Sequence, residues 1–280
     1  FSEKEDHVEV STSLLRARIA KSDGTMDVMD KDGNLIAGEP LGGGAFFEGD
    51  TVGCLKEMPE DEHYYGFGEK TGPLDKRGTR MVMWNKDAMY NDEGDPLYQS
   101  HPFYMAIRKG RAYGVFFDNT FRSVFDVGLS RPGALSFSAE SGELDYWILP
   151  GPRPADVLEN YGDLVGTMPL PPLWGIGHHQ CRWSYETAER VREIRDGYQK
   201  HDIPLDAIYL DIHYMKGYRV FTFDRENFPD PDGLIEELER DGVKTVVIVD
   251  PGIKIDKDYK PYKEGLENGH FVLDPDGSPF

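Results

Sequence analysis

Residues 207–224 read A-I-Y-L-D-I-H-Y-M-K-G-Y-R-V-F-T-F-D. The stretch opens with a short apolar run, Ala207 to Leu210, which stops at a carboxylate, Asp211. An apolar run of this length between polar residues is typical of a buried parallel strand. A charge placed where such a strand ends suits a catalytic or sugar-binding rim better than a core. The stretch therefore predicts an enzyme site at the end of a strand.

The sequence around this stretch alternates between strand and helix patterns. We predict two helices, one capped by Ser184 and one capped by Asp230 with Pro231 at its first position and Gly242 after its end. The three predicted strands are Leu173–Gly177, Ala207–Leu210 and Thr245–Val249. Such alternation predicts a parallel sheet, and the pattern alone leaves a closed barrel and an open sheet as alternatives.

Polar residues follow each of these predicted strands. They are the pair His178-His179, Asp211 and Asp250. In β/α barrels the active site lies at the carboxyl ends of the strands, so three polar groups at one edge favour a functional rim over simple loop capping. Neither a helical histidine pair nor a cysteine partner accompanies them, so we predict hydrogen-bonding histidines, no metal and no cofactor.

The part of the chain before Pro150 has a different pattern. Short apolar or aromatic runs alternate with turn signals such as Asp23-Gly24 and Ser141-Gly142, which predicts an antiparallel β-sandwich. The predicted strands are Val8–Val10, Leu14–Ile19, Phe46–Phe47, Phe103–Ile107, Tyr113–Phe117, Ser123–Phe125, Leu135–Phe137 and Tyr146–Leu149. We place the sandwich at 1–150, a proline-rich linker with a short helix over Ala155–Tyr161 at 151–172, and the barrel strands at 173–280.

Composition excludes some partners. The formal charge is −20, from 51 acidic and 31 basic residues, and a phosphate backbone would be repelled by such a surface. No apolar run approaches the roughly 18 residues of a membrane span, so we predict neither nucleic acid nor membrane as a partner. The cysteines, Cys54 and Cys181, form no CxxC pattern, which favours a reducing, cytoplasmic compartment. The chain begins with Phe1 and stops at Phe280 in a loop-like segment, so we expect a fragment.

Three aromatic segments allow competing interpretations. The G-x-G spacing in Tyr64–Lys70 lacks the strand-to-helix context of a nucleotide loop, so we predict a tight hairpin. The polar segment Met83–Asp95, with Trp84, Asp87 and Tyr90, is either solvated surface or a loop that reaches over a neighbouring pocket. Trp183 is either a sugar-stacking residue or part of a core.

Several segments together resemble glycoside hydrolase family 31, whose members are mostly α-glucosidases. They occur in the family's order between Tyr64 and Ile253, and residues before about 60 are less specific. The segments are Y-Y-G-F-G-E-K, W-N-K-D-A-M-Y, Y-Q-S-H-P-F-Y-M, Y-G-V-F-F-D-N, P-P-L-W-G-I-G-H-H-Q-C-R-W-S-Y, L-D-I-H-Y-M-K-G-Y-R-V-F-T-F-D and V-D-P-G-I.

This resemblance implies a mutarotase-like β-sandwich followed by the first part of a (β/α)8 TIM barrel. It also implies retaining hydrolysis of a terminal α-linked sugar of an oligosaccharide or α-glucoside, by two carboxyl groups roughly 5 Å apart. In the family the nucleophile ends the fourth barrel strand and the acid/base lies further on. Both positions would fall beyond Phe280, which would leave the chain by itself inactive.

The resemblance also assigns substrate contacts. Asp211 matches the residue that grips the outer hydroxyls of the sugar in the −1 subsite, and Ile212 and Ile253 match apolar walls. Trp183 stands where the family has an aromatic residue, and Asp87 matches a sandwich-loop residue near the +1 subsite. His213 departs from the commoner Asp of a D-I-D-Y-M segment. Alternatives left open are an α-xylosidase, an α-transglucosylase or α-glucan lyase, and a non-catalytic carbohydrate-binding module; the oligomeric state is undetermined.

Overall fold

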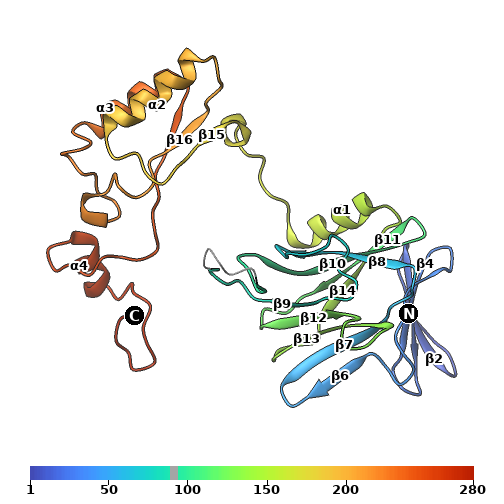
Figure 1. The fold of residues 1–280 in the computed structure, drawn as a ribbon. Coiled ribbons are helices and arrows are strands. Elements are labelled where there is room, and N and C mark those ends of the chain that lie inside the picture. Colours follow the sequence, from blue (N-terminus) through green and yellow to red (C-terminus); the bar gives the residue numbers. More distant parts are fainter. Residues whose placement is uncertain (89–93) are drawn as a thin grey trace. The chain divides into compact units, whose positions relative to one another are not determined.

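A computed structural model describes residues 1–88 and 94–280. The chain divides into two compact units, Phe1–Met168 and Pro169–Phe280. Strands dominate the first unit, and the second combines a small sheet with helices (Figure 1). Each unit is described by itself below.

Over residues 1–88 and 94–168 the first unit forms three antiparallel sheets. Their strand orders are β1-β2-β3-β4-β5, β14-β11-β10-β8 and β6-β7-β13-β12-β9. The strands are β1 (Ser2–Glu3), β2 (His7–Ser11), β3 (Leu15–Ala20), β4 (Met26–Asp30), β5 (Leu35–Ala37), β6 (Ala45–Glu48), β7 (Thr51–Glu57), β8 (Glu62–Gly68), β9 (Arg80–Met83), β10 (Ser100–Arg108), β11 (Arg111–Phe117), β12 (Ser123–Val127), β13 (Ala134–Ala139) and β14 (Tyr146–Pro150). Each strand predicted before residue 150 overlaps one of these, so the antiparallel prediction is confirmed.

Aromatic side chains from two of these sheets fill the core of the first unit. Phe125 of β12 lies edge-on to Phe67 of β8, with ring centroids 5.5 Å apart. Phe117 of β11 lies 5.1 Å from Phe137 of β13. Aromatic pairs at such distances add attraction to the burial of their apolar area. The facing sheets therefore form the sandwich that the alternating pattern predicts.

The prediction of a hairpin at Tyr64–Lys70 is wrong. The segment is strand β8, which pairs with β10, and its register shifts between Ser100 and Tyr104. Gly66 and Gly68 have φ values of +113° and +83°, and a Cβ on Gly66 would lie 2.9 Å from the Phe103 carbonyl oxygen. The two glycines thus let the strand bulge while its neighbour stays close, which a side chain would prevent.

Helix α1 (Pro154–Val165) lies within the stretch that the sequence suggests as a linker. It packs on β11 and β14 (Figure 1). Its Val157 side chain is fully buried. Tyr161 stacks on Phe103 with ring centroids 4.4 Å apart. The helix predicted at Ala155–Tyr161 is therefore confirmed, and its apolar face belongs to the first unit.

The second unit contains a parallel sheet in the order β15-β16-β17. Its elements are the 3₁₀ turns η1 (Leu173–Ile176) and η2 (Lys216–Tyr218), the strands β15 (His179–Gln180), β16 (Ala207–Tyr209) and β17 (Lys244–Val246), and the helices α2 (Ala188–Lys200), α3 (Pro231–Arg240) and α4 (Lys260–Glu267). Ile208, Leu210, Val191 and Leu238 are buried in one core between sheet and helices. The alternation predicted from the sequence is confirmed.

Two local predictions in this unit are wrong. Leu173–Ile176 is a 3₁₀ turn rather than a strand, because Pro172 precedes it and the Gly177 amide bonds back to Trp174. The first strand is His179–Gln180, which pairs with Ala207 and Ile208 of β16. Helix α2 is capped by Thr187, whose side chain accepts a bond from the Arg190 amide, rather than by Ser184. The cap of α3 is as predicted, since Asp230 accepts a bond from the Gly233 amide.

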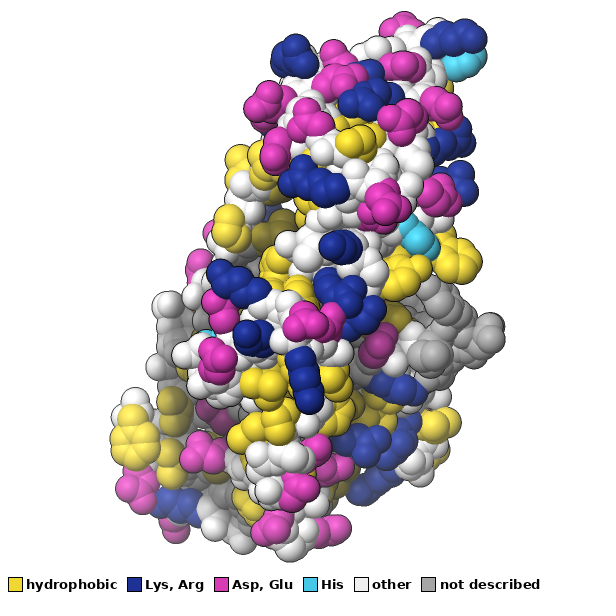
Figure 2. All heavy atoms as spheres, turned by 90° about the vertical axis from the view of Figure 1, so that its left-hand side faces the viewer, with side chains coloured by type: hydrophobic (Ala, Val, Ile, Leu, Met, Phe, Trp, Pro, Cys, Tyr) yellow, Lys and Arg dark blue, Asp and Glu magenta, His cyan; other side chains and the backbone are white. Residues whose placement is uncertain are grey.

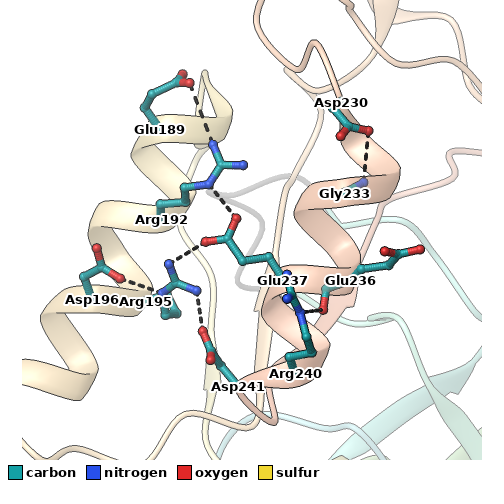
Figure 3. A network of polar contacts seen from close by, with 10 residues as sticks. All are labelled: Glu189, Arg192, Arg195, Asp196, Asp230, Gly233, Glu236, Glu237, Arg240 and Asp241. Carbon is teal, nitrogen blue, oxygen red and sulfur yellow. Dashed lines mark hydrogen bonds and ion pairs between the residues drawn. The ribbon is translucent and has the colours of Figure 1, made fainter.

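Helices α2 and α3 are joined by an ionic network (Figure 3). Arg195, only 8% exposed, donates to Glu237 at 2.7 Å, to Asp196 at 2.6 Å and to Asp241. Arg192 donates to the other Glu237 oxygen at 2.8 Å. Burial opposes the charge of Arg195, but hydrogen bonds to Glu237 and Asp196 raise its pKa. The network fixes the two helices on one side of the sheet.

On the face shown in Figure 2, acidic and basic side chains are interspersed with apolar ones. The net charge of −20 is therefore not gathered into one acidic area on this face. Within 1–88 and 94–280, no helix combines the length and apolar character that crossing a membrane requires.

Candidate functional site

Three polar residues meet beyond the carboxyl ends of β15 and β16. The Ser184 hydroxyl donates to Asp211 Oδ2 at 3.3 Å. His213 Nδ1 forms a hydrogen bond with the same hydroxyl. Ser184 is buried, whereas Asp211 and His213 are partly exposed. The arrangement holds a carboxylate at the strand ends with part of its surface open to a ligand.

The two bonds define where the protons lie. A serine hydroxyl has one hydrogen, so Ser184 accepts from His213 when it donates to Asp211. His213 therefore carries its proton on Nδ1. Among the residues that the structure describes, Ser184 is the hydrogen-bond partner of the Asp211 carboxylate. A carboxylate has four acceptor positions, so most of its capacity is left for hydroxyl groups of a ligand.

The backbone at this site is held in an unusual conformation. Ser184 has φ +70° and Asp211 has φ +59°, in the left-handed region that glycine adopts most easily. Such a conformation is tolerated by Asp better than by most residues, and it persists where surrounding structure imposes it. Strain of this kind clusters at functional sites, which supports Asp211 as a site residue.

Ile212 and Ile253, the two predicted wall residues, pack against the same buried core of the second unit. The segments that carry them are tied together, since the Tyr214 hydroxyl donates to the Ile248 carbonyl at 2.7 Å. A second tie joins Arg219 Nε to Asp256 Oδ2 at 2.9 Å. The loops after β16 and β17 therefore form one connected rim beside Asp211.

Trp183 stands next to Ser184 in the chain and is 81% exposed. The exposure rules out a core position within this unit and leaves the indole face open for stacking. Asp250 is also exposed, four residues after the end of β17.

The histidine pair lies elsewhere, so its predicted place on the rim is wrong. His179 begins strand β15, and its Nε2 bonds the Trp174 carbonyl at 2.8 Å. His178 precedes the strand and contacts the Tyr198 hydroxyl at 3.2 Å. Both histidines are thus at the amino end of the sheet, because the strand starts later than the apolar run suggests.

Asp87 lies in the first unit and is exposed. The base of its loop is fixed by Lys70, which donates to the Val82 carbonyl and to Asp95, each at 2.6 Å. Tyr90, predicted to act with Asp87, lies outside the described residues. Across 1–88 and 94–280 no three His, Cys, Asp or Glu side chains gather in a way that could hold a metal ion.

Comparison with known families identifies the class of protein. Residues 168–280 match the profile of the glycosyl hydrolases family 31 TIM-barrel domain. Residues 1–126 match that of the glycosyl hydrolase 31 N-terminal galactose mutarotase-like domain. The chain belongs to glycoside hydrolase family 31. The mutarotase-like sandwich followed by part of a TIM barrel, expected from the resemblance, is confirmed.

Two curated relatives that match the chain are α-glucosidases. The chain is 49% identical to alpha-glucosidase 2 of Bacillus thermoamyloliquefaciens, across 99% of this chain and 36% of that protein. It is 38% identical to the alpha-glucosidase of Saccharolobus solfataricus, across 78% of this chain and 32% of that protein. The chain thus spans about a third of the length of these relatives.

A solved structure of another member of the family has a similar fold. The family 31 dextranase of Flavobacterium johnsoniae, solved in complex with glucose, is 32% identical and superimposes with a TM-score of 0.89. The match covers 99% of this chain and 35% of the dextranase chain.

Sequence reasoning missed the role of Ser184. The residue type fits a helix cap, and nothing in W-S-Y indicates a left-handed serine between Asp211 and His213. The unusual His213 was the one available signal, because a histidine beside a site carboxylate needs a partner for its ring nitrogen.

Proposed function

We propose that the protein containing this chain is a retaining, exo-acting α-glycosidase that removes terminal α-linked glucose from oligosaccharides. The observation that carries the proposal is the Asp211 carboxylate, held by Ser184 beyond the end of β16 and partly open to a ligand. Family membership and α-glucosidase relatives support it. We place the sandwich at 1–150, a linker at 151–172 and the barrel from 173.

In the proposed reaction Asp211 binds substrate rather than attacking it. Its carboxylate accepts bonds from two hydroxyls of the terminal sugar, and charged acceptors make such bonds strong. A sugar without those hydroxyls would leave the charge unpaired and bind poorly. The nucleophile and the acid/base that retaining chemistry needs are assigned to no residue of this chain.

The other proposed contacts follow from the resemblance to the family. Ile212 and Ile253 supply apolar walls, Trp183 an aromatic face, and Asp87 a contact for the sugar on the leaving side. Ile after Asp211 favours glucose over xylose as the terminal sugar.

A second candidate is a different reaction on the same scaffold. Transfer to another sugar, or binding without catalysis, would use Asp211 in the same way.

Turnover of an aryl α-glucoside and an aryl α-xyloside by the full-length protein tests the proposal. We expect release of the aryl alcohol from the glucoside and little from the xyloside. Asp211→Asn should abolish most turnover. The matched control Asp163→Asn, at an exposed position of α1, should not. Turnover of the xyloside alone would overturn the choice of glucose, and turnover of neither would favour a binding module.

A further inference from the structure

We infer that Tyr218 contacts the terminal sugar and recognises the hydroxymethyl group that glucose has and xylose lacks. The inference rests on the proposed function, in which Asp211 binds the outer hydroxyls of that sugar. Tyr218 is the last residue of η2, in the loop that follows β16. Its ring lies edge-on to the His213 ring, with centroids 5.6 Å apart and an angle of 74° between the planes. His213 is in turn hydrogen-bonded to Ser184, the partner of Asp211.

The Tyr218 side chain is open to a ligand. It is 56% exposed. Among the residues that the structure describes, its hydroxyl has no hydrogen-bond partner. A tyrosine with an open ring and a free hydroxyl offers an apolar surface and a polar group together. A hydroxymethyl group has the same two parts, an apolar methylene and a hydroxyl, so the two groups match in chemistry.

The backbone at Tyr218 is strained. Gly217 has φ +55° and Tyr218 has φ +58°, so two successive residues lie in the left-handed region. Glycine adopts this conformation readily, whereas a bulky side chain with a positive φ is an outlier. Residues held in such conformations cluster at ligand-binding and active sites. The strain therefore supports a function for the tyrosine ring.

The loop that carries Tyr218 is fixed on both sides. Met215 and Val220, which flank it in the chain, are buried in the core of the second unit. Lys254 Nζ donates to the Gly217 carbonyl at 2.7 Å. A binding surface whose backbone is already ordered loses little entropy when a ligand arrives. The ring of Tyr218 is thus presented from a fixed position.

His213 supplies a second polar group beside this ring. Its Nδ1 carries the proton that bonds Ser184, which leaves Nε2 as an acceptor. Within 1–88 and 94–280, Nε2 has no hydrogen-bond partner. The group around Asp211 therefore has two acceptors for sugar hydroxyls, the carboxylate and this ring nitrogen.

The shape of glucose indicates which of its parts meets Tyr218. The outer hydroxyls include the one on C4, which lies across the ring from the anomeric carbon. The hydroxymethyl group projects from C5, next to C4, so it lies at the same end of the sugar. Tyr218 is separated from the Ser184–Asp211 bond by the His213 ring, and in the proposed complex it packs on this end. Contact with a group that the competing sugar lacks is a means of discrimination.

Turnover of an aryl α-glucoside and an aryl α-xyloside by the full-length protein tests the inference. Tyr218→Ala should lower kcat/KM for the glucoside about tenfold, equivalent to about 1.4 kcal/mol, and leave that for the xyloside unchanged. Tyr218→Phe keeps the ring and should lower the glucoside value only about threefold. The matched control is Phe221→Ala, in the same loop, with φ +62° and 69% exposure. It should change neither value.

Calorimetric titration of the full-length protein with glucose and with xylose gives a readout without turnover. Tyr218→Ala should weaken glucose binding about tenfold and leave xylose binding unchanged. Equal losses for the two sugars, or no loss for either, would overturn the role of Tyr218. Equal losses with a lower thermal midpoint would mean that the ring packs against the rest of the enzyme. If wild type turned over neither glycoside, the proposed function would fail, and the titrations would still decide the role of Tyr218.

Discussion

Ser184 and Asp211 share a 3.3 Å side-chain hydrogen bond although each residue has a left-handed backbone. The two conformations direct a serine and a carboxylate from neighbouring strand ends toward one another. His213 forms a hydrogen bond with the same hydroxyl. The serine therefore links the histidine ring to the carboxylate, and the position of each depends on the other. The site is thus built from strained backbone and one shared hydroxyl group, which donates to Asp211 and accepts from His213.

Asp211→Asn should separate sugar binding from folding. Asn tolerates the left-handed region as Asp does, so the unfolding free energy should change by less than about 0.5 kcal/mol. Loss of the charged acceptor should lower kcat/KM for an aryl α-glucoside roughly 100-fold in the full-length protein. Asp211→Ala, which lacks that tolerance, should lose activity and also melt lower. Equal melting of the Asn and Ala variants would contradict the strain argument.

Ser184→Ala should act through Asp211. The substitution leaves the carboxylate and His213 without their common partner, at a cost of about 1–3 kcal/mol for a bond to a charged group. We expect a smaller loss of kcat/KM than in Asp211→Asn, because the carboxylate keeps its charge and loses only the group that positions it. Ser184→Gly removes the hydroxyl without adding backbone strain and serves as the control, so it should lose activity as the alanine variant does. An alanine variant with the kcat/KM of wild type would argue against a role of Ser184 in positioning the carboxylate.

The sequence predicted the fold well but misplaced parts of the rim. Alternating runs such as Phe103–Ile107 reveal strands because their burial follows the period of the sheet. The strand predicted at Leu173–Gly177 (L-W-G-I-G) was wrong, because apolar character alone does not distinguish a strand from a 3₁₀ turn. The first strand of this sheet starts at His179. The left-handed Ser184 could not be foreseen, since positive φ has a sequence signal mainly at glycine.

Lys56→Met should destabilise the first unit. Lys56 donates to Glu39 at 2.6 Å, and both side chains are almost fully buried. Removing the lysine leaves a buried carboxylate unpaired, which costs about 3–5 kcal/mol. Adding Glu39→Gln to this variant should restore much of the loss in urea unfolding. A double variant as unstable as Lys56→Met would mean that packing, rather than charge, dominates.

Acid should weaken the same pair. Burial works against the Glu39 charge, but Lys56 and several hydrogen bonds lower the Glu39 pKa below its ordinary value of 4.5. A carboxyl with a lowered pKa stabilises the folded state above the unfolded pKa and loses that contribution as pH falls. The stability difference between wild type and Glu39→Gln should therefore be full at pH 6 and shrink below pH 4.5, by urea unfolding.

Glu62 should show the opposite dependence. Burial raises its pKa above 4.5, although the Tyr64 and Tyr113 hydroxyls donate to it at 2.9 and 2.8 Å. A raised carboxyl pKa means that stability falls as pH rises through that range. Glu62→Gln keeps an acceptor for both tyrosines and removes the charge, so it should be more stable than wild type at pH 7. The advantage should vanish below pH 4.5, and one that persists there would implicate packing instead.

The left-handed pair at Ser184 and Asp211 has a consequence for laboratory evolution. Glycine would relieve roughly 1–2 kcal/mol of strain at either position, yet it would also remove the hydroxyl or the carboxylate. A screen for heat resistance alone should therefore enrich glycine at these positions, and a screen for sugar turnover should eliminate the same variants. At these two positions, selection for thermal stability and selection for catalytic activity would favour different residues.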